Sequence, residues 1–265
     1  MSVVTSSSEA AAQTAVEIAA KALSLPTVRS QAASLADAAA RDGATHRAYL
    51  AELLAAEVDA RQTRRRERRI KEAHFPRIKT LSAFNFDAAS AVPAATIAAL
   101  ADGGWIDKGE PVVLLGDSGT GKTHLLIALG IAACEQGRSV RYLTAAQLVN
   151  ELVEAADDRQ LSRTVARYGR IELLQLDELG YLQLDTRGAE LLFQVLTERE
   201  ERASVAVASN APFSEWTATF TDPRLAAAVV DRLTFNAHII QTGSDSYRLR
   251  STRAKTTTKG TTTNT

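Results

Sequence analysis

Cysteine is almost absent from this sequence, because Cys134 is the only one among 265 residues. An intramolecular disulfide is therefore excluded, and Cys134, which stands among Ala, Ile and Leu, is expected to pack in a core. No apolar run approaches the roughly 20 residues that span a bilayer. The first twenty residues also lack the basic flank and apolar block of a signal peptide. We therefore expect a cytoplasmic globular protein with no membrane partner.

The sequence also lacks an overall excess of charge, since 31 basic residues balance 31 acidic ones. The balance hides a local excess, because nine cations between Arg61 and Lys79 stand against Glu67 and Glu72 alone, a local charge of +7. Seven of these cations lie in the stretch expected to be helical: Arg61, Arg64, Arg65, Arg66, Arg68, Arg69 and Lys71. Cations spread over more than one helix face favour phosphate backbones, and the absence of interleaved aromatics argues against base stacking. We interpret this segment as a duplex DNA-binding helix, with a solvated charged helix as the alternative.

Composition divides the chain into five parts. They are a flexible start rich in Ala and Ser (1–22), a small helical DNA-binding domain (23–76), a linker (77–93), a large α/β domain (94–250) and a disordered Thr-rich tail (251–265). Breaks in the helical domain are expected near Pro26 and Asp42-Gly43. Pro76 ends its basic helix, because proline removes a hydrogen-bond donor and restricts the residue before it.

The large domain alternates strand-like and helix-like segments. Strands are predicted at 112–115, 139–143, 171–176, 204–208 and 237–241. Five strands with intervening helices predict a parallel sheet covered on both faces. Ligands of such sheets bind outside the carboxyl ends of the strands.

A phosphate-binding motif follows the first predicted strand. Residues 116–123 read Gly-Asp-Ser-Gly-Thr-Gly-Lys-Thr and fill the pattern GxxxxGK[ST] between a strand and a helix. Lys122 is expected to reach the β- and γ-phosphates, and the Thr123 hydroxyl to ligate Mg²⁺. The nucleotide contacts are predicted at Gly116, Asp117, Ser118, Gly119, Thr120, Gly121, Lys122, Thr123 and His124. The expected cofactors are ATP and Mg²⁺.

Further polar residues follow the later strands. Asp177 is expected to hold Mg²⁺ through its water shell, and Glu178 to polarise the water that attacks the γ-phosphate. Asn210 could orient that water or cap a turn. Arg232 is the candidate for an arginine supplied to a neighbouring subunit, and Arg248 for one that reaches the nucleotide of its own subunit. Either arginine could instead be a surface cation.

Several segments together resemble the AAA+ branch that contains the DnaC-type helicase loaders and the IstB-type helper ATPases of insertion-sequence transposition. They are residues 74–81, 122–124, 176–181, 209–210, 212–216, 231–233 and 246–248. The resemblance covers roughly residues 23–250 and is closer to the IstB type. It implies an AAA+ P-loop sheet flanked by helices, with a small all-helical N-terminal domain. Gln175 departs from the expected pattern, since it puts an amide into an apolar strand.

The resemblance assigns a role to each candidate residue. Lys122 is the nucleotide lysine, and Thr123 and Asp177 hold the metal. Glu178 is the acid that polarises the attacking water, and Asn210 is the polar sensor residue. Arg232 matches the arginine finger, and Arg248 the second sensor.

The function implied by the resemblance is an ATPase that oligomerises on duplex DNA and stimulates a cognate transposase. A DnaC-like replicative helicase loader is the alternative from the same fold. Two others from different classes are a small-molecule P-loop kinase and a nucleotide-gated scaffold without useful turnover. Glu178 and the cationic helix argue against the kinase.

Overall fold

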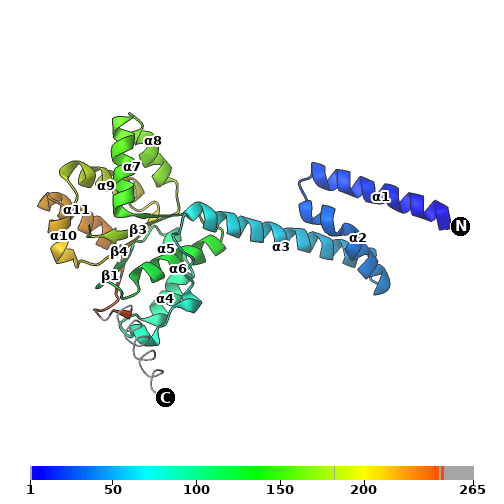
Figure 1. The fold of residues 1–265 in the computed structure, drawn as a ribbon, viewed down its shortest axis with the longest axis horizontal. Coiled ribbons are helices and arrows are strands. Elements are labelled where there is room, and N and C mark those ends of the chain that lie inside the picture. Colours follow the sequence, from blue (N-terminus) through cyan, green and yellow to red (C-terminus); the bar gives the residue numbers. More distant parts are fainter. Residues whose placement is uncertain (1, 182, 245, 248–265) are drawn as a thin grey trace, which may run out of the picture. The chain divides into compact units, whose positions relative to one another are not determined.

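A computed structural model describes residues 2–181, 183–244 and 246–247 of the chain. The chain separates into two compact units, residues 1–67 and 68–265, which are described one at a time (Figure 1). The boundary lies inside a helix and not at Pro76, where the sequence predicted the end of the first domain. The reason is that the last turn of this helix packs on the second unit, where Ala73 is fully buried.

The second unit is built on one sheet of five parallel strands. They are β1 (Val112–Leu115), β2 (Val140–Thr144), β3 (Leu173–Leu179), β4 (Ser204–Ser209) and β5 (His238–Gln241). The strand order is β2-β3-β4-β1-β5, and every neighbouring pair is parallel. The predicted parallel sheet is confirmed, although β3 continues to Leu179, beyond the predicted end at residue 176.

Helices cover both faces of this sheet (Figure 1). One face carries α4 (Ala94–Ala101), α5 (Gly104–Asp107) and α6 (Lys122–Glu135); the other carries α7 (Ala145–Asp157), α8 (Leu161–Gly169), α9 (Thr186–Arg199), α10 (Trp216–Thr219) and α11 (Pro223–Thr234), with the short 3₁₀ turn η3 (Phe213–Glu215) before α10. Successive β1 residues alternate between the two cores, with Val112 and Leu114 on the α6 side and Val113 and Leu115 on the other. Burial raises the pKa of the Cys134 thiol, in the α6-side core, to about 12, so this cysteine packs as expected.

Residues 77–93, predicted to be a linker, belong to the folded core of the second unit. They contain two 3₁₀ turns, η1 (Leu81–Ala83) and η2 (Asp87–Ala89). Phe84 and Phe86 pack against the same apolar cluster as α6, and Val92 is buried in it. Aromatic side chains in this segment therefore fix its position on the sheet. The prediction of a linker did not include these contacts.

The first unit is helical, with α1 (Ser2–Ala22), α2 (Pro26–Arg41) and α3 (His46–Ala73), the last of which continues into the second unit. The expectation that residues 1–22 have no fold is wrong, because α1 occupies them. The Ala-rich composition favours a helix, and Ala20 packs in a small core with Val28, Ala32 and Leu53. Among the described residues, no helix combines the length and the hydropathy needed to cross a membrane.

A buried carboxylate connects α2 and α3. The first turn of α2 has no cap from the residue before it. Instead Glu57 of α3 accepts hydrogen bonds from the backbone N–H groups of Thr27 (2.7 Å) and Val28 (3.1 Å), and Arg64 donates to its other oxygen (2.9 Å). Burial alone would raise the pKa of Glu57, but the hydrogen bonds from Val28, Thr27 and Arg64 outweigh it and lower that pKa.

Replacing Glu57 with Ala should lower the free energy of unfolding of the first unit by about 1–3 kcal/mol, because two helix N–H groups lose their acceptor. The loss should be complete near neutral pH and shrink as the pH falls through the lowered pKa, where the wild-type carboxylate also becomes protonated. Urea unfolding at pH 7 and pH 3 measures both effects. Glu52→Ala, on the exposed side of the same helix, is the control. Equal stability of the two variants would contradict the assignment.

Candidate nucleotide-binding site

The glycine-rich loop lies between the end of β1 and the start of α6. Gly119 and Gly121 have φ values of 85° and 101°, which favour glycine over every other residue. Space is also lacking, since a Cβ on Gly121 would lie 2.7 Å from the ring of Phe84 and one on Gly119 would lie 2.3 Å from the Ser246 hydroxyl. The loop therefore depends on these glycines for its backbone conformation and for its close packing.

Lys122, the first residue of α6, places its ammonium group inside this loop. Its Nζ donates hydrogen bonds to the carbonyl oxygens of Gly116 (2.6 Å) and Asp117 (2.8 Å). The side chain is buried, and the positive end of α6 lies beside it. This is the arrangement in which a P-loop lysine and helix N-terminus bind phosphate groups.

The ends of two neighbouring strands hold the loop in place. Gly116 N–H donates to the carbonyl of Ser209, the last residue of β4, and Asp117 N–H donates to the Gly243 carbonyl after β5. The hydroxyls of Thr120 and Thr242 lie 2.6 Å apart in a buried hydrogen bond. No sequence motif marks the contribution of Thr242, because it comes from a contact between residues 122 positions apart.

The acids of β3 lie beside the loop because of a backbone irregularity. Consecutive strand residues normally point to opposite faces, but the pairing of β3 with β4 shifts register between Leu176 and Leu179. Glu178 has a φ of 60° and is exposed, whereas Asp177 is buried. Both residues therefore face the same cavity.

That cavity has a volume of about 850 Å³. Ten of the residues predicted from the sequence line it: Ser118, Gly119, Thr120, Gly121, Lys122, Thr123, His124, Asp177, Glu178 and Asn210. The Asn210 side-chain oxygen is buried and has no hydrogen-bond partner among the described residues. An unpaired amide oxygen beside a phosphate loop is available to a ligand or its bound water.

One wall of the cavity comes from residues 74–89, which the sequence analysis did not assign to the site. The ring of Phe84 packs edge-on against His124, with centroids 5.2 Å apart. His124 Nε2 also lies 2.9 Å from the Thr80 carbonyl oxygen. The closely spaced aromatics Phe84 and Phe86, in a stretch predicted to be a linker, were the signal that could have identified this wall.

The residues present suit a magnesium ion. The Thr123 hydroxyl and the Asp177 carboxylate are hard oxygen donors on the same cavity. Across residues 2–181, 183–244 and 246–247, no three His, Cys, Asp or Glu side chains gather to hold a metal by themselves. Mg²⁺ at phosphate sites takes most of its ligands from phosphate and water, so two protein oxygens are sufficient.

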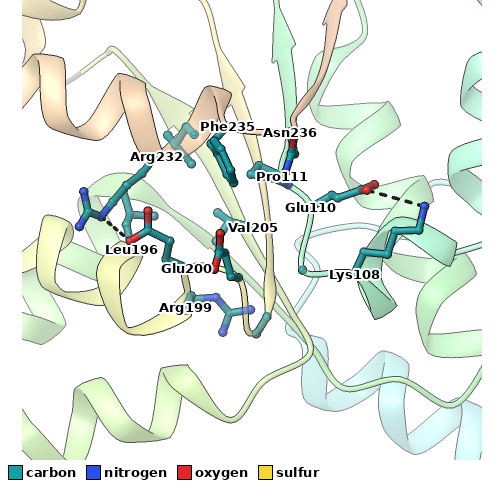
Figure 2. A pocket seen from close by; sticks show the side chains of 14 residues that line it. Lys108, Glu110, Pro111, Leu196, Arg199, Glu200, Val205, Arg232, Phe235 and Asn236 are labelled. Atoms are coloured by element: carbon teal, nitrogen blue, oxygen red, sulfur yellow. Dashed lines mark ion pairs between the residues drawn. The ribbon is translucent and has the colours of Figure 1, made fainter.

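Arg232 lies at the opposite edge of the sheet, in a smaller pocket (Figure 2). The pocket is lined by residues that precede β1, β4 and β5, including Pro111, Ala203 and Asn236. The phosphate loop and the acids instead lie at the carboxyl ends of the strands. Within one chain, Arg232 is therefore remote from Lys122. Arg248 lies outside the described residues.

Two neighbours fix the position of Arg232. Its Nε lies 3.2 Å from a carboxylate oxygen of Glu200, as Figure 2 shows, and its guanidinium carbon stands 4.4 Å from the centre of the Phe193 ring. The side chain is 23% exposed. An ion pair and a cation–π contact together hold the guanidinium in one orientation at the surface.

The seven cations of the basic segment differ in their partners. Arg61 and Arg64 pair with Glu57, and Arg68 and Arg69 pair with Glu72. Arg65, Arg66 and Lys71 are exposed and have no ion pair within the described part of the chain. The latter three are free to contact an external phosphate.

The strand order, the loop after β1 and the acid pair in β3 define a P-loop ATP-binding protein of the AAA+ class. Residues 18–255 match the family described as IstB-like ATP binding protein, and the chain belongs to this family.

Relatives of this chain include several proteins of insertion sequences. The insertion sequence ATP-binding protein y4iQ/y4nD/y4sD of Sinorhizobium fredii is 38% identical over 86% of this chain and 77% of its own length. The IS21 ATP-binding protein of Pseudomonas aeruginosa is 36% identical over 86% and 87%, respectively.

Solved structures share the fold at lower identity. DnaA from Aquifex aeolicus, bound to AMPPCP, matches with a TM-score of 0.55 and 21% identity over 69% of this chain and 56% of that one. DnaI matches with a TM-score of 0.53 and 18% identity over 68% and 98%.

Replacing Gly121 with Ala should lower ATP affinity at least tenfold, because the new Cβ collides with Phe84 and moves the loop (~1.4 kcal/mol or more). Gly43→Ala is the matched control, since Gly43 also has a positive φ (62°) but no atom within 4 Å of its Cβ position. It should carry a similar backbone cost of about 1–2 kcal/mol without loss of nucleotide binding. Titration with a fluorescent ATP analogue measures the affinities. Wild-type affinity in Gly121→Ala would contradict the placement of the nucleotide.

Proposed function

We propose that this chain is an ATP-hydrolysing helper of a transposase that assembles on duplex DNA. The observation that carries the proposal is the separation of Arg232 from the cavity that contains Lys122 and Glu178. Each chain then has the phosphate loop and the acids at one edge of its sheet and Arg232 at the other. A second copy, placed edge to edge, supplies its Arg232 to the phosphate loop and acids of the first.

Hydrolysis in this proposal needs residues from two chains. Lys122 binds the phosphates, and Thr123 and Asp177 hold Mg²⁺, which neutralises charge on the β- and γ-phosphate oxygens. Glu178 orients and polarises the attacking water, and Asn210 binds that water or the γ-phosphate. Arg232 of the neighbouring chain stabilises charge on the transferring group. Phe193 and Glu200 already hold that arginine in one orientation, so little side-chain entropy is lost when it contacts the transferring phosphate.

DNA binding is proposed for the exposed cations of α3. Arg65, Arg66 and Lys71 supply the unpaired cations, whereas Arg64 is engaged with the buried Glu57. Backbone contacts of this kind bind without strong sequence preference. Several chains side by side multiply a modest affinity, so assembly and DNA binding reinforce each other.

The transposase partner is proposed from the relatives, which are named as proteins of insertion sequences. A helicase-loader function has no comparable support, because the likeness to the solved structures extends to the fold alone. Recovery of a replicative helicase, but no transposase, in a pull-down from host cells would overturn this choice. Phosphate release without an acceptor, rising with duplex DNA, would exclude a small-molecule kinase.

Replacing Arg65 and Arg66 with Gln should weaken duplex DNA binding and reduce the slope of log affinity against log salt by about two, one for each lost phosphate contact. The matched control replaces Arg29 and Arg41, exposed cations of α2, with Gln. Fluorescence anisotropy with a labelled duplex across a salt series measures the slope. An unchanged slope in the Arg65 and Arg66 variant would remove α3 from the DNA interface.

Arg232→Ala should abolish most ATP turnover while leaving ATP affinity unchanged, because the lost group serves a neighbouring site. Glu178→Gln should bind ATP without hydrolysing it. A mixture of the two inactive variants should regain turnover, since Glu178→Gln chains donate Arg232 to the intact sites of Arg232→Ala chains. Phosphate release as a function of mixing ratio measures this rescue. Absence of rescue, in a mixture shown to co-assemble, would contradict a role across the interface.

A further inference from the structure

Tyr142 makes two contacts that connect the metal acid to the end of the basic helix. Its hydroxyl donates a buried 2.6 Å hydrogen bond to Asp177 Oδ2. Its ring lies against that of Phe75, with centroids 6.1 Å apart and planes inclined by 59°. All three residues belong to the second unit. None of the roles assigned above uses this tyrosine.

The contact with Asp177 follows from strand register. In the pairing of β2 with β3, Tyr142 is opposite Gln175 and Thr144 is opposite Asp177, so Tyr142 and Asp177 share one face of the sheet. Burial and the adjacent carboxylate raise the pKa of Tyr142 far above its usual range. In this bond the phenol O–H is the donor, because a carboxylate oxygen accepts.

The second oxygen of the carboxylate is also engaged. Asp177 Oδ1 accepts a hydrogen bond of 2.9 Å from the Glu178 N–H. With one donor on each oxygen, the plane of the carboxylate is fixed relative to the loop. Tyr142 supplies the donor that comes from outside β3, so its position decides how Asp177 faces the Thr123 side of the cavity.

Phe75 connects this hydrogen bond to α3. The helix ends at Ala73, and His74 adopts a φ of 58°, which turns the chain so that Phe75 packs on the core of the second unit. The last turn of α3 in this unit carries Lys71 and follows Arg68 and Arg69. Lys71 is the cation of this turn without an ion pair among the described residues, and Phe75, four residues further on, contacts the Tyr142 ring.

We propose that Tyr142 is a positioning residue that couples phosphate contacts on the end of α3 to the orientation of Asp177, and so to Mg²⁺-dependent nucleotide binding. The inference rests on the proposed DNA binding by α3 and names how that binding regulates the nucleotide site. The phenol hydroxyl sets the orientation of the Asp177 carboxylate. The Phe75 ring transmits a displacement of the end of α3 to the Tyr142 ring.

The test uses the full chain and a non-hydrolysable ATP analogue. The quantity measured is the Mg²⁺ concentration that gives half-maximal analogue binding, with and without duplex DNA, alongside binding in excess EDTA. Tyr142→Phe keeps the ring contact and removes the hydrogen bond. Phe75→Leu keeps the hydrogen bond and weakens the ring contact. Tyr168→Phe is the matched control, because Tyr168 is a second buried tyrosine whose hydroxyl donates to a carboxylate, that of Glu151, outside this cavity.

Tyr142→Phe should raise the half-saturating Mg²⁺ concentration about tenfold or more, as for one lost hydrogen bond to a charged group, with analogue binding in EDTA unchanged. Duplex DNA should shift the wild-type value. Phe75→Leu should abolish that DNA-induced shift while keeping the DNA-free value. Tyr168→Phe should match the wild type in every arm.

A wild-type Mg²⁺ requirement in Tyr142→Phe would overturn the inference, as would a DNA-induced shift that survives in Phe75→Leu. Wild-type chains that bind duplex DNA without any shift would overturn the coupling while leaving the proposed function intact. Failure of the wild type to bind duplex DNA at all would instead refute the proposed function.

Discussion

All five strands of the sheet run in the same direction, and the rest of the site depends on this constraint. Parallel strands bring their carboxyl ends to one edge, so the phosphate loop after β1, the acids of β3 and Asn210 after β4 meet there. The same constraint sends Arg232, which precedes β5, to the other edge. In the proposed function, an arginine on that edge serves the site of another chain, and the strand direction would in this way link hydrolysis to assembly.

A buried polar contact sets the spacing between β3, which carries the acids, and α6, which carries Lys122. Gln175 interrupts an apolar strand, and its Nε2 donates a 2.6 Å hydrogen bond to the Leu126 carbonyl within α6. Its side chain also fills the space beside Gly130, where a Cβ would lie 2.5 Å from the amide oxygen. The amide thus ties the acid-bearing strand to the helix that carries Lys122. The departure from an apolar pattern at Gln175 is therefore explained by packing.

Much of this arrangement could be predicted from the sequence, because the strands, the phosphate loop and the acids of β3 have local signatures. The remainder depended on contacts between distant residues. The fold of residues 77–93 depends on Phe84 and Phe86 reaching the α6-side core, and the donor to Asp177 depends on the register of β2 with β3. Cation counts also could not show that Arg64 is paired with Glu57, because the two residues are seven positions apart on α3 and lack the three- or four-residue spacing of ordinary helix ion pairs.

In the proposed function, ATP turnover requires the edge of a second chain. Particle mass and phosphate release, measured together over a range of protein concentrations with ATP, Mg²⁺ and duplex DNA, test this requirement. Turnover per chain should rise as particles larger than one chain form, and stay low below that concentration. Full turnover by a particle with the mass of a single chain would contradict it.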